Sequence, residues 1–211
     1  MSFSSSKENI LKKIRKALTQ TAPLPFPGSE GNTSVFTPSS QDLEVEFAEE
    51  FTRLMGKFVF CFDNAELEQQ LQNLVIQQKW TKIFCAEPAI REHLSPALQT
   101  LLTADISSSD VSFTSCECLV ARTGTIVLSS VTESGRTASI YAPIHLCIAT
   151  TSQLVYDVKD GLQMIKEKYP AGLPSMVSFA SGPSRTADIE KTLVVGVHGP
   201  KEVYVFLVEE M

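Results

Sequence analysis

Short runs of nearly continuous apolar residues alternate with segments of helical periodicity in the first half of the chain. Lys57–Phe62 and Lys82–Ala86 are two such runs, and Asp63 is placed to cap a helix between them. That helix would bury the apolar side chains that recur at helical spacing, Leu67, Leu71, Leu74 and Val75. A strand that is apolar on both sides has to be buried on both sides. The alternation therefore predicts an α/β fold with a mostly parallel sheet and helices on both faces.

Proline and aspartate mark the ends of two later helices. Pro88 is placed to begin a helix that Pro96 interrupts, because proline suits the first turn of a helix and disrupts its interior. Asp157 is placed to cap a further helix, which Pro170 ends. Between these helices, four short apolar runs separated by glycine turns predict a local antiparallel insertion. The four runs are Cys118–Ala121, Thr125–Ser129, Ala138–Tyr141 and Ile144–Ala149.

The start of the chain differs in pattern from the rest. Residues 5–19 predict an amphipathic helix with lysine and arginine on its polar face, and residues 21–39 form a proline-rich stretch. The helix has two interpretations: it packs on its own domain or on a second subunit, or it binds a membrane surface or a partner. The first is favoured because the apolar face has no large aromatic side chain. We expect an N-terminal arm of residues 1–38 and one α/β domain of residues 39–211.

The charge and hydropathy of the chain argue against two broad classes of protein. There are 18 basic and 24 acidic residues, for a net charge of −6, whereas a general nucleic-acid binder needs a basic face to neutralise phosphates. No apolar run approaches the roughly 20 residues that span a bilayer. The first residues also lack the apolar core of a signal peptide. We therefore expect a cytoplasmic protein with no membrane span and no nucleic-acid partner.

Five cysteines are present, and three of them lie within apolar runs. Buried free thiols in a reducing compartment explain this pattern best. Cys116 and Cys118 are separated by one residue, whereas the usual zinc and iron–sulfur pairs are separated by two. No second pair is available to complete a cluster. We therefore expect no metal site.

Residues 181–200 combine two glycine turns with an arginine and a histidine. An apolar run leads into Ser181-Gly182-Pro183-Ser184, where we expect a helix to begin, followed by the second glycine turn and a final strand. Glycine allows a ligand close to the backbone, and the free amides of a helix N-terminus favour an anion. Arg185 offers a planar guanidinium that suits a carboxylate or phosphate. The alternative is structural: Ser184 caps the helix and Arg185 pairs with an acidic residue nearby.

Other candidate groups also have two interpretations. His198 could act as a general base near neutral pH, or it could fix its turn through backbone hydrogen bonds. Thr123-Gly124-Thr125 offers two hydroxyls and a close-approach glycine that could hold a phosphate or carboxylate. His145 is structural when considered alone, but it could line the same pocket. Ser-His-Asp order, a Walker motif, HExxH and the strict GxGxxG fingerprint are all missing, so no complete catalytic set is evident.

These segments resemble the LUD domain family, and within it the LutC-type lactate utilisation proteins. The matching pieces occur in the same order and at similar spacing over roughly residues 110–208. They are Thr123-Gly124-Thr125-Ile126-Val127-Leu128, Gly135-Arg136, Pro143-Ile144-His145, the run from Gly182 to Glu190, and the run from Val194 to Pro200. Family members often carry glutamate directly before the Thr-Gly-Thr motif, whereas this chain has Arg122.

The resemblance implies a three-layer α/β fold similar to the NagB/RpiA/CoA-transferase-like group. It also implies a role in oxidising L-lactate to pyruvate alongside partner subunits that carry iron–sulfur clusters. This chain would be the component without a cluster; it would bind a small anionic ligand or a cofactor of unspecified identity, or organise the partners. We expect one pocket formed by Thr123, Gly124, Thr125, Arg136, Gly182, Ser184, Arg185, Thr186, His198 and Gly199.

Two alternatives remain open at the level of sequence. The first is a self-sufficient enzyme, similar to a CoA transferase or a sugar-phosphate isomerase, that works in the same pocket. Such an enzyme needs a positioned carboxylate, and Arg122 occupies the position where one would be expected. The second is a pure assembly subunit that docks through residues 1–38. Whether the chain is itself an enzyme is therefore left undecided.

Overall fold

The computed structural model describes residues 4–19, 39, 41–189 and 192–209. It divides the chain into two units, Met1–Pro38 and Ser39–Met211. In the first unit, α1 (Ser4–Leu18) confirms the predicted amphipathic helix, and the side chains of Ile10, Leu11 and Ile14 on it are exposed. No helix among the described residues is long and apolar enough to cross a lipid bilayer.

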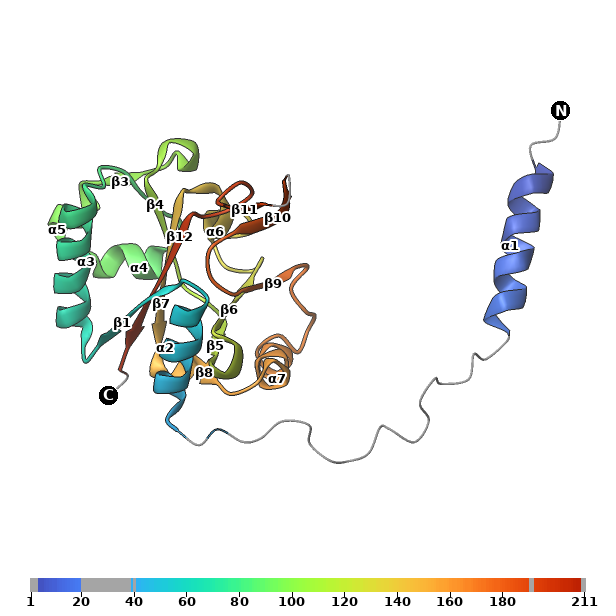
Figure 1. The fold of residues 1–211 in the computed structure, drawn as a ribbon, viewed down its shortest axis with the longest axis horizontal. Coiled ribbons are helices and arrows are strands. Elements are labelled where there is room, and N and C mark those ends of the chain that lie inside the picture. The colour runs from blue at the N-terminus through green and yellow to red at the C-terminus, as the bar shows by residue number, and fades with distance from the viewer. Residues whose placement is uncertain (1–3, 20–38, 40, 190–191, 210–211) are drawn as a thin grey trace. The chain divides into compact units, whose positions relative to one another are not determined.

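The second unit is built on a six-stranded sheet in which every neighbouring pair is parallel (Figure 1). The strands, in spatial order, are β1 (Lys57–Cys61), β12 (Glu202–Val208), β7 (Ile144–Thr150), β4 (Val111–Thr114), β2 (Ile83–Cys85) and β3 (Leu102–Thr103). The predicted α/β class and mostly parallel sheet are confirmed. The two predicted strands from the first half of the chain are β1 and β2.

Three helices cover one face of this sheet: α3 (Asn64–Gln78), α4 (Pro88–His93) and α5 (Pro96–Gln99). Asp63 caps α3 as predicted, because its carboxylate accepts a hydrogen bond of 2.7 Å from the backbone N–H of Glu66. The predicted interruption at Pro96 is also confirmed, and the hydroxyl of Ser95 caps α5. Leu71 and Val75 of α3 pack with Phe113 and Phe206 of the sheet in one apolar cluster.

The other face is covered by α2 (Leu43–Arg53) and by a second, four-stranded sheet (Figure 1). The order of strands in this second sheet is β8 (Leu154–Val155), β5 (Cys118–Val120), β6 (Thr125–Ser129) and β9 (Val177–Ala180). Leu119 and Ile126 pack against α2 and the parallel sheet. Val120 and Val127 instead pack with Ile165 of α7 (Val158–Lys168). The second sheet is therefore an additional layer between the parallel sheet and α7.

The antiparallel insertion is confirmed for β5 and β6, but two of its four predicted strands lie elsewhere. Ile144–Ala149 belongs to β7 in the centre of the parallel sheet. Ala138–Tyr141 is a single helical turn, α6, in which the N–H groups of Ile140 and Tyr141 donate to the carbonyl of Thr137. Four residues are too few to show whether a pattern has a period of 2 or 3.6, so the sequence did not distinguish the two.

The helix expected from Ser184 onward is also wrong. The structure has a hairpin there, in which β10 (Arg185–Ile189) pairs antiparallel with β11 (Thr192–Val195). Three of the four residues of β11 are threonine or valine, and β10 contains Thr186 and Ile189; such branched side chains favour strands over helices. The remaining elements are three short 3₁₀ turns, η1 (Ile106–Ser108), η2 (Ala121–Thr123) and η3 (Thr151–Gln153).

A buried polar pair lies on the second face of the parallel sheet. Nε2 of His145 is 2.8 Å from Oγ1 of Thr114, and His145 is only 1% exposed. Burial lowers the pKa of His145 to about 4, because the charged imidazolium would lose its hydration there. The imidazole is therefore neutral at physiological pH, and it links β4 to β7 as a structural group that does not line a pocket.

Because burial keeps His145 neutral in the folded protein, we expect the free energy of unfolding to fall in mild acid. In the unfolded chain the pKa of His145 is near 6.5, so its imidazole takes up a proton between pH 7 and pH 5. The folded protein does not take up this proton. The free energy of unfolding therefore falls by about 2 kcal/mol over this pH range. His145→Gln keeps a hydrogen-bonding side chain beside Thr114 and should escape that loss. Urea unfolding at the two pH values measures it. His93→Gln, at an exposed position, should behave like the wild type; equal pH dependence in His145→Gln would contradict the assignment.

Candidate functional site

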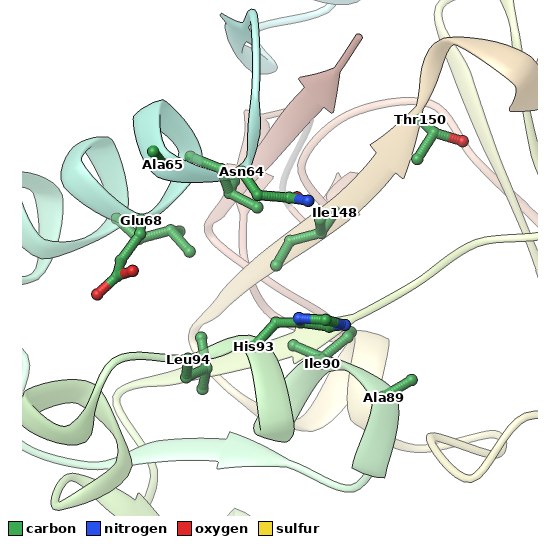
Figure 2. Close-up of a pocket in the computed structure, with 11 residues that line it drawn as sticks. Asn64, Ala65, Glu68, Ala89, Ile90, His93, Leu94, Ile148 and Thr150 are labelled. Carbon is green, nitrogen blue, oxygen red and sulfur yellow. The ribbon is translucent and has the colours of Figure 1, made fainter. Parts of the chain in front are cut away.

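The carboxyl edge of the parallel sheet contains a cavity of about 580 Å³. Ligands of open α/β sheets bind beyond the carboxyl ends of the strands. Here α3 packs against β1 and β12, while α4 packs against β2, so the two helices leave part of the central strand β7 uncovered. Figure 2 shows the side chain of Ile148 projecting from β7 into the space between the helices, with Asn64 on one side and His93 on the other.

The lining of this carboxyl-edge cavity is predominantly apolar. Leu67, Leu71, Ile90, Leu94 and Ile148 form most of its wall, and Ala65 and Ala89 complete the apolar part. The polar lining consists of Asn64, Glu68, His93 and Thr150. Neither lysine nor arginine is among the described residues that line it. His93 lies at an exposed position of α4. No local sequence pattern indicates the cavity, because α3 and α4 come together only through the sheet.

The Thr123-Gly124-Thr125 motif lies on the opposite face, beneath α2. Gly124 has a φ of 53°, and a Cβ atom there would lie 2.5 Å from the backbone nitrogen of Phe51. The hydroxyl of Thr125 is 2.7 Å from that of Ser181 and 2.8 Å from that of Thr123. Thr125 is also buried. The missing side chain of Gly124 thus leaves room for the backbone of α2. The hydrogen bond between the hydroxyls of Thr125 and Ser181 links β6 to the end of β9.

Arg122, directly before the Thr-Gly-Thr motif, forms an ion pair with Asp157. Nε of Arg122 is 2.9 Å from Oδ2 of Asp157, the residue that caps α7. Burial of the Asp157 carboxyl would raise its pKa, but hydrogen bonds from Arg122 and from the N–H of Lys159 outweigh this and hold the pKa below its ordinary value. Arg122 therefore helps to attach the start of α7 to the second sheet.

The first glycine turn of residues 181–200 packs on the end of α2. Gly182 has a φ of 85°, and a Cβ atom there would lie 2.6 Å from the carbonyl oxygen of Leu54, the C-cap of α2. The guanidinium of Arg185 donates a hydrogen bond to the same carbonyl. Arginine at a helix C-terminus satisfies a carbonyl that has no partner within the helix and complements the helix dipole. This contact gives Arg185 a structural role that the sequence did not indicate.

The second glycine turn lies beside the first. The N–H of Ser184 donates to the carbonyl of Pro200, and the N–H of Gly196 donates to the carbonyl of Ser184, both at 2.9 Å. A Cβ atom on Gly199 would lie 2.9 Å from Cβ of Ser184. Ser184, His198 and Gly199 are thus brought together, at the amino end of β12.

A surface hollow of about 490 Å³ opens at this position. His198 and Lys201 line it together with Tyr141, Pro143 and the glycine turn that contains Gly196. No aspartate or glutamate is among the described residues in the lining. Lys201 was not among the predicted site residues. It lies three residues after His198 and directly precedes β12. Its closeness to His198 in the sequence was the available signal. This amino-edge hollow is lined by basic side chains, whereas neither lysine nor arginine is among the described residues that line the carboxyl-edge cavity.

The remaining predicted residues lie apart from this hollow. Arg136 donates a hydrogen bond of 2.7 Å to the hydroxyl of Ser175, next to the start of β9, whereas Thr125 meets Ser181 just beyond the end of β9. The ladder of β6 and β9 therefore separates Arg136 from Thr125. Thr186 lies within the hairpin, opposite Val194. The ten predicted residues occupy four regions of the fold: the α2 contact, the amino-edge hollow, the β10–β11 hairpin and the Arg136 end of the ladder.

Glu117, between the two closely spaced cysteines, organises a separate buried cluster. Its carboxylate is 2.8 Å from Nζ of Lys168 and accepts a hydrogen bond of 2.9 Å from the hydroxyl of Tyr169. Burial opposes ionisation of Glu117, yet the hydrogen bonds from Lys168, Ser129 and Tyr169 lower its pKa. This cluster joins α7 to β5 and β6. Within the described ranges there is no group of three or more His, Cys, Asp or Glu side chains placed to hold a metal ion.

A family model described as the LUD domain matches residues 44–208 of the chain. Among curated proteins, Lactate utilization protein C of Deinococcus radiodurans is 34% identical over 106 residues, which cover 50% of this chain and 49% of that protein. Lactate utilization protein C of Bacillus subtilis is 35% identical over 104 residues, which cover 48% of this chain and 43% of that protein. The chain thus spans about half the length of the curated relatives it matches.

The fold also matches a solved structure. The crystal structure of a DUF162 family protein from Deinococcus radiodurans superposes with a TM-score of 0.62, covering 82% of this chain and 99% of that one. The two sequences are 19% identical over the match. This likeness supports the same α/β architecture.

A pair of glycine substitutions tests the packing role of the Thr-Gly-Thr motif. Gly124 and Gly135 both have positive φ, at 53° and 58°, but only Gly124 faces backbone atoms within 4 Å of an added Cβ. Gly135→Ala should therefore cost roughly 1–2 kcal/mol of unfolding free energy, from backbone strain alone. Gly124→Ala should cost roughly 1–3 kcal/mol more, because α2 is displaced. Urea unfolding of both variants measures the difference; equal losses would rule out the α2 contact as the reason for Gly124.

Proposed function

Because this chain belongs to the LUD domain family, we propose that it is a component of a lactate utilisation system that oxidises L-lactate to pyruvate. The family model confirms the resemblance on which this rests, and it spans nearly all of the parallel sheet and its covering layers. The observation that carries the proposal is the set of relatives named Lactate utilization protein C, at about one-third identity. The family model covers the glycine turns around the amino-edge hollow.

We propose further that this component holds no iron–sulfur cluster of its own and works with partner subunits that do. All five cysteines are buried and unpaired. Burial raises the pKa of Cys61 and of Cys85 to about 11 and that of Cys118 to about 12. Clusters are held by thiolates, so thiols that stay protonated are poor ligands. Five free thiols also fit a reducing compartment, and we place the protein in the cytoplasm.

Within this function, we assign the anionic ligand to the amino-edge hollow. The ammonium of Lys201 and the imidazole of His198 are both in its lining. A carboxylate such as lactate or pyruvate gains from a cation and loses from nearby acidic side chains, and no acidic group lines the hollow among the described residues. This assignment keeps His198 and Gly199 from the predicted pocket and adds Lys201, while Ser184 packs against Gly199 beside the hollow.

An assembly role is the second candidate function. Helix α1 exposes Ile10, Leu11 and Ile14 on one face, and an unpaired apolar stripe on a helix favours contact with another protein surface. In this case the hollow would be unused, and the protein would organise the cluster-bearing subunits. The two candidates share the same pathway and differ in whether this chain binds a small anion.

The pathway assignment predicts a growth defect. Deleting the gene should abolish or strongly slow growth on L-lactate as sole carbon source and leave growth on pyruvate unchanged, because the lesion precedes pyruvate. Restoring the wild-type chain should restore growth, and cell extracts should regain L-lactate oxidation. Normal growth of the deletion strain on L-lactate would overturn the proposed function.

The anion assignment predicts a thermal shift at the hollow. L-lactate or pyruvate at about 100 times its dissociation constant should stabilise the protein by about 2.7 kcal/mol, or roughly 5–10 °C in melting temperature. Lys201→Gln keeps most of the side-chain stem but removes the charge, and it should lose the shift. Lys166→Gln, at an exposed position on α7, should retain it. No shift in the wild type, or the same shift in Lys201→Gln, would favour the assembly role.

A further inference from the structure

The carboxyl-edge cavity has properties that the proposed lactate function does not use. Its volume of about 580 Å³ lies within the range of about 300–1,000 Å³ that is usual for small-molecule sites. A three-carbon acid would fill only a small part of it. The size alone therefore indicates a larger ligand than lactate or pyruvate.

The cavity also breaks the rule that a central parallel strand is covered on both faces. Ile148 belongs to β7, which has a strand on each side, yet its side chain is only partly buried because it faces the cavity (Figure 2). Leaving apolar surface exposed there costs roughly 25 cal/mol for each Å². An apolar ligand that covered Ile148, Ile90 and Leu94 would recover this free energy on binding.

The charges around the cavity select against anions. Glu68 is the charged side chain in the lining, and its Oε1 accepts a hydrogen bond of 3.1 Å from Nε2 of Gln72. Asn64 and His93 point toward the cavity from α3 and α4 (Figure 2). Within the described part of the chain, neither of these two side chains has a hydrogen-bond partner. They can therefore donate to or accept from a ligand, while Glu68 repels a negative charge.

We propose that the carboxyl-edge cavity binds a neutral, mostly apolar ring compound that carries one or two hydrogen-bonding nitrogen or oxygen atoms. The ring system packs on Ile148 between α3 and α4, and its polar atoms meet Asn64, His93 or Thr150. The site is at the opposite edge of the sheet from the amino-edge hollow. The proposal therefore stands whether or not the hollow binds lactate.

Two fluorescent probes with the same ring skeleton test this. N-phenyl-1-naphthylamine is neutral, and 8-anilino-1-naphthalenesulfonate is its sulfonated, anionic counterpart. The full-length protein should bind the neutral probe saturably at one site, with a rise in fluorescence as the rings leave water. It should bind the sulfonate at least about tenfold more weakly, a difference of about 1.4 kcal/mol. Equal or tighter binding of the sulfonate would overturn the proposal, as would a failure of the neutral probe to saturate.

Substitutions locate the bound probe. Ile148→Phe extends into the cavity and should weaken binding of the neutral probe at least about tenfold. Ile76→Phe makes the same change on the exposed side of α3, where Ile76 is 74% exposed, and should leave binding unchanged. If Ile148→Phe does not fold, Ala65→Phe fills the same cavity from an exposed position. Unchanged binding in a folded cavity variant would overturn the proposal.

A charge change tests the selection against anions separately. Glu68→Gln removes the negative charge and retains an oxygen that can accept from Gln72. The affinity for the sulfonate should rise several-fold, while that for the neutral probe should change less than twofold. An unchanged ratio of the two affinities would show that Glu68 does not control the ligand class, and the proposed preference for a neutral compound would be withdrawn.

Discussion

The parallel pairing of all six strands is the constraint on which the rest of the structure depends. A parallel pair cannot be joined by a tight turn. Each strand must therefore be followed by a crossover that returns the chain to the amino ends of the strands. Both faces must also be covered, because the strands are apolar on both sides. The crossovers α3, α4 and α5 cover one face, and α2 and the second sheet cover the other. The residues of the two glycine motifs, Gly124, Gly182 and Arg185, contact the helix α2 that covers the second face.

Helix α2 explains much of what made the motifs resemble a binding site. Gly124 and Gly182 both lie where an added Cβ would strike α2 or its C-cap, and Arg185 donates to the C-cap carbonyl. Glycines that admit a ligand and glycines that admit a helix look the same in a sequence, since both serve close approach to the backbone. The side chain of Arg185 likewise suits a carbonyl at a helix end as well as a carboxylate. The motif thus encodes a docking surface for α2.

The sequence predicted features that depend on neighbouring residues and missed those that depend on distant ones. Asp63 and Pro96 act within a few residues of their own positions, so the ends of α3 and α5 were predictable. The hairpin of β10 and β11 was mistaken for a helix, because its polar residues masked the strand preference of Thr186 and Val194. The carboxyl-edge cavity joins α3, α4 and β7, segments that only the sheet brings together. No local pattern could indicate it.

The amino-edge hollow and the carboxyl-edge cavity lie at opposite ends of the same central strands, and the length of these strands sets the distance between them. Pro143 lines the amino-edge hollow just before β7, and Thr150 lines the carboxyl-edge cavity where β7 ends. At about 3.3 Å per residue, the strand separates them by roughly 20 Å. Strands in the middle of a packed sheet do not shorten, so ligands in the two sites cannot react directly with each other.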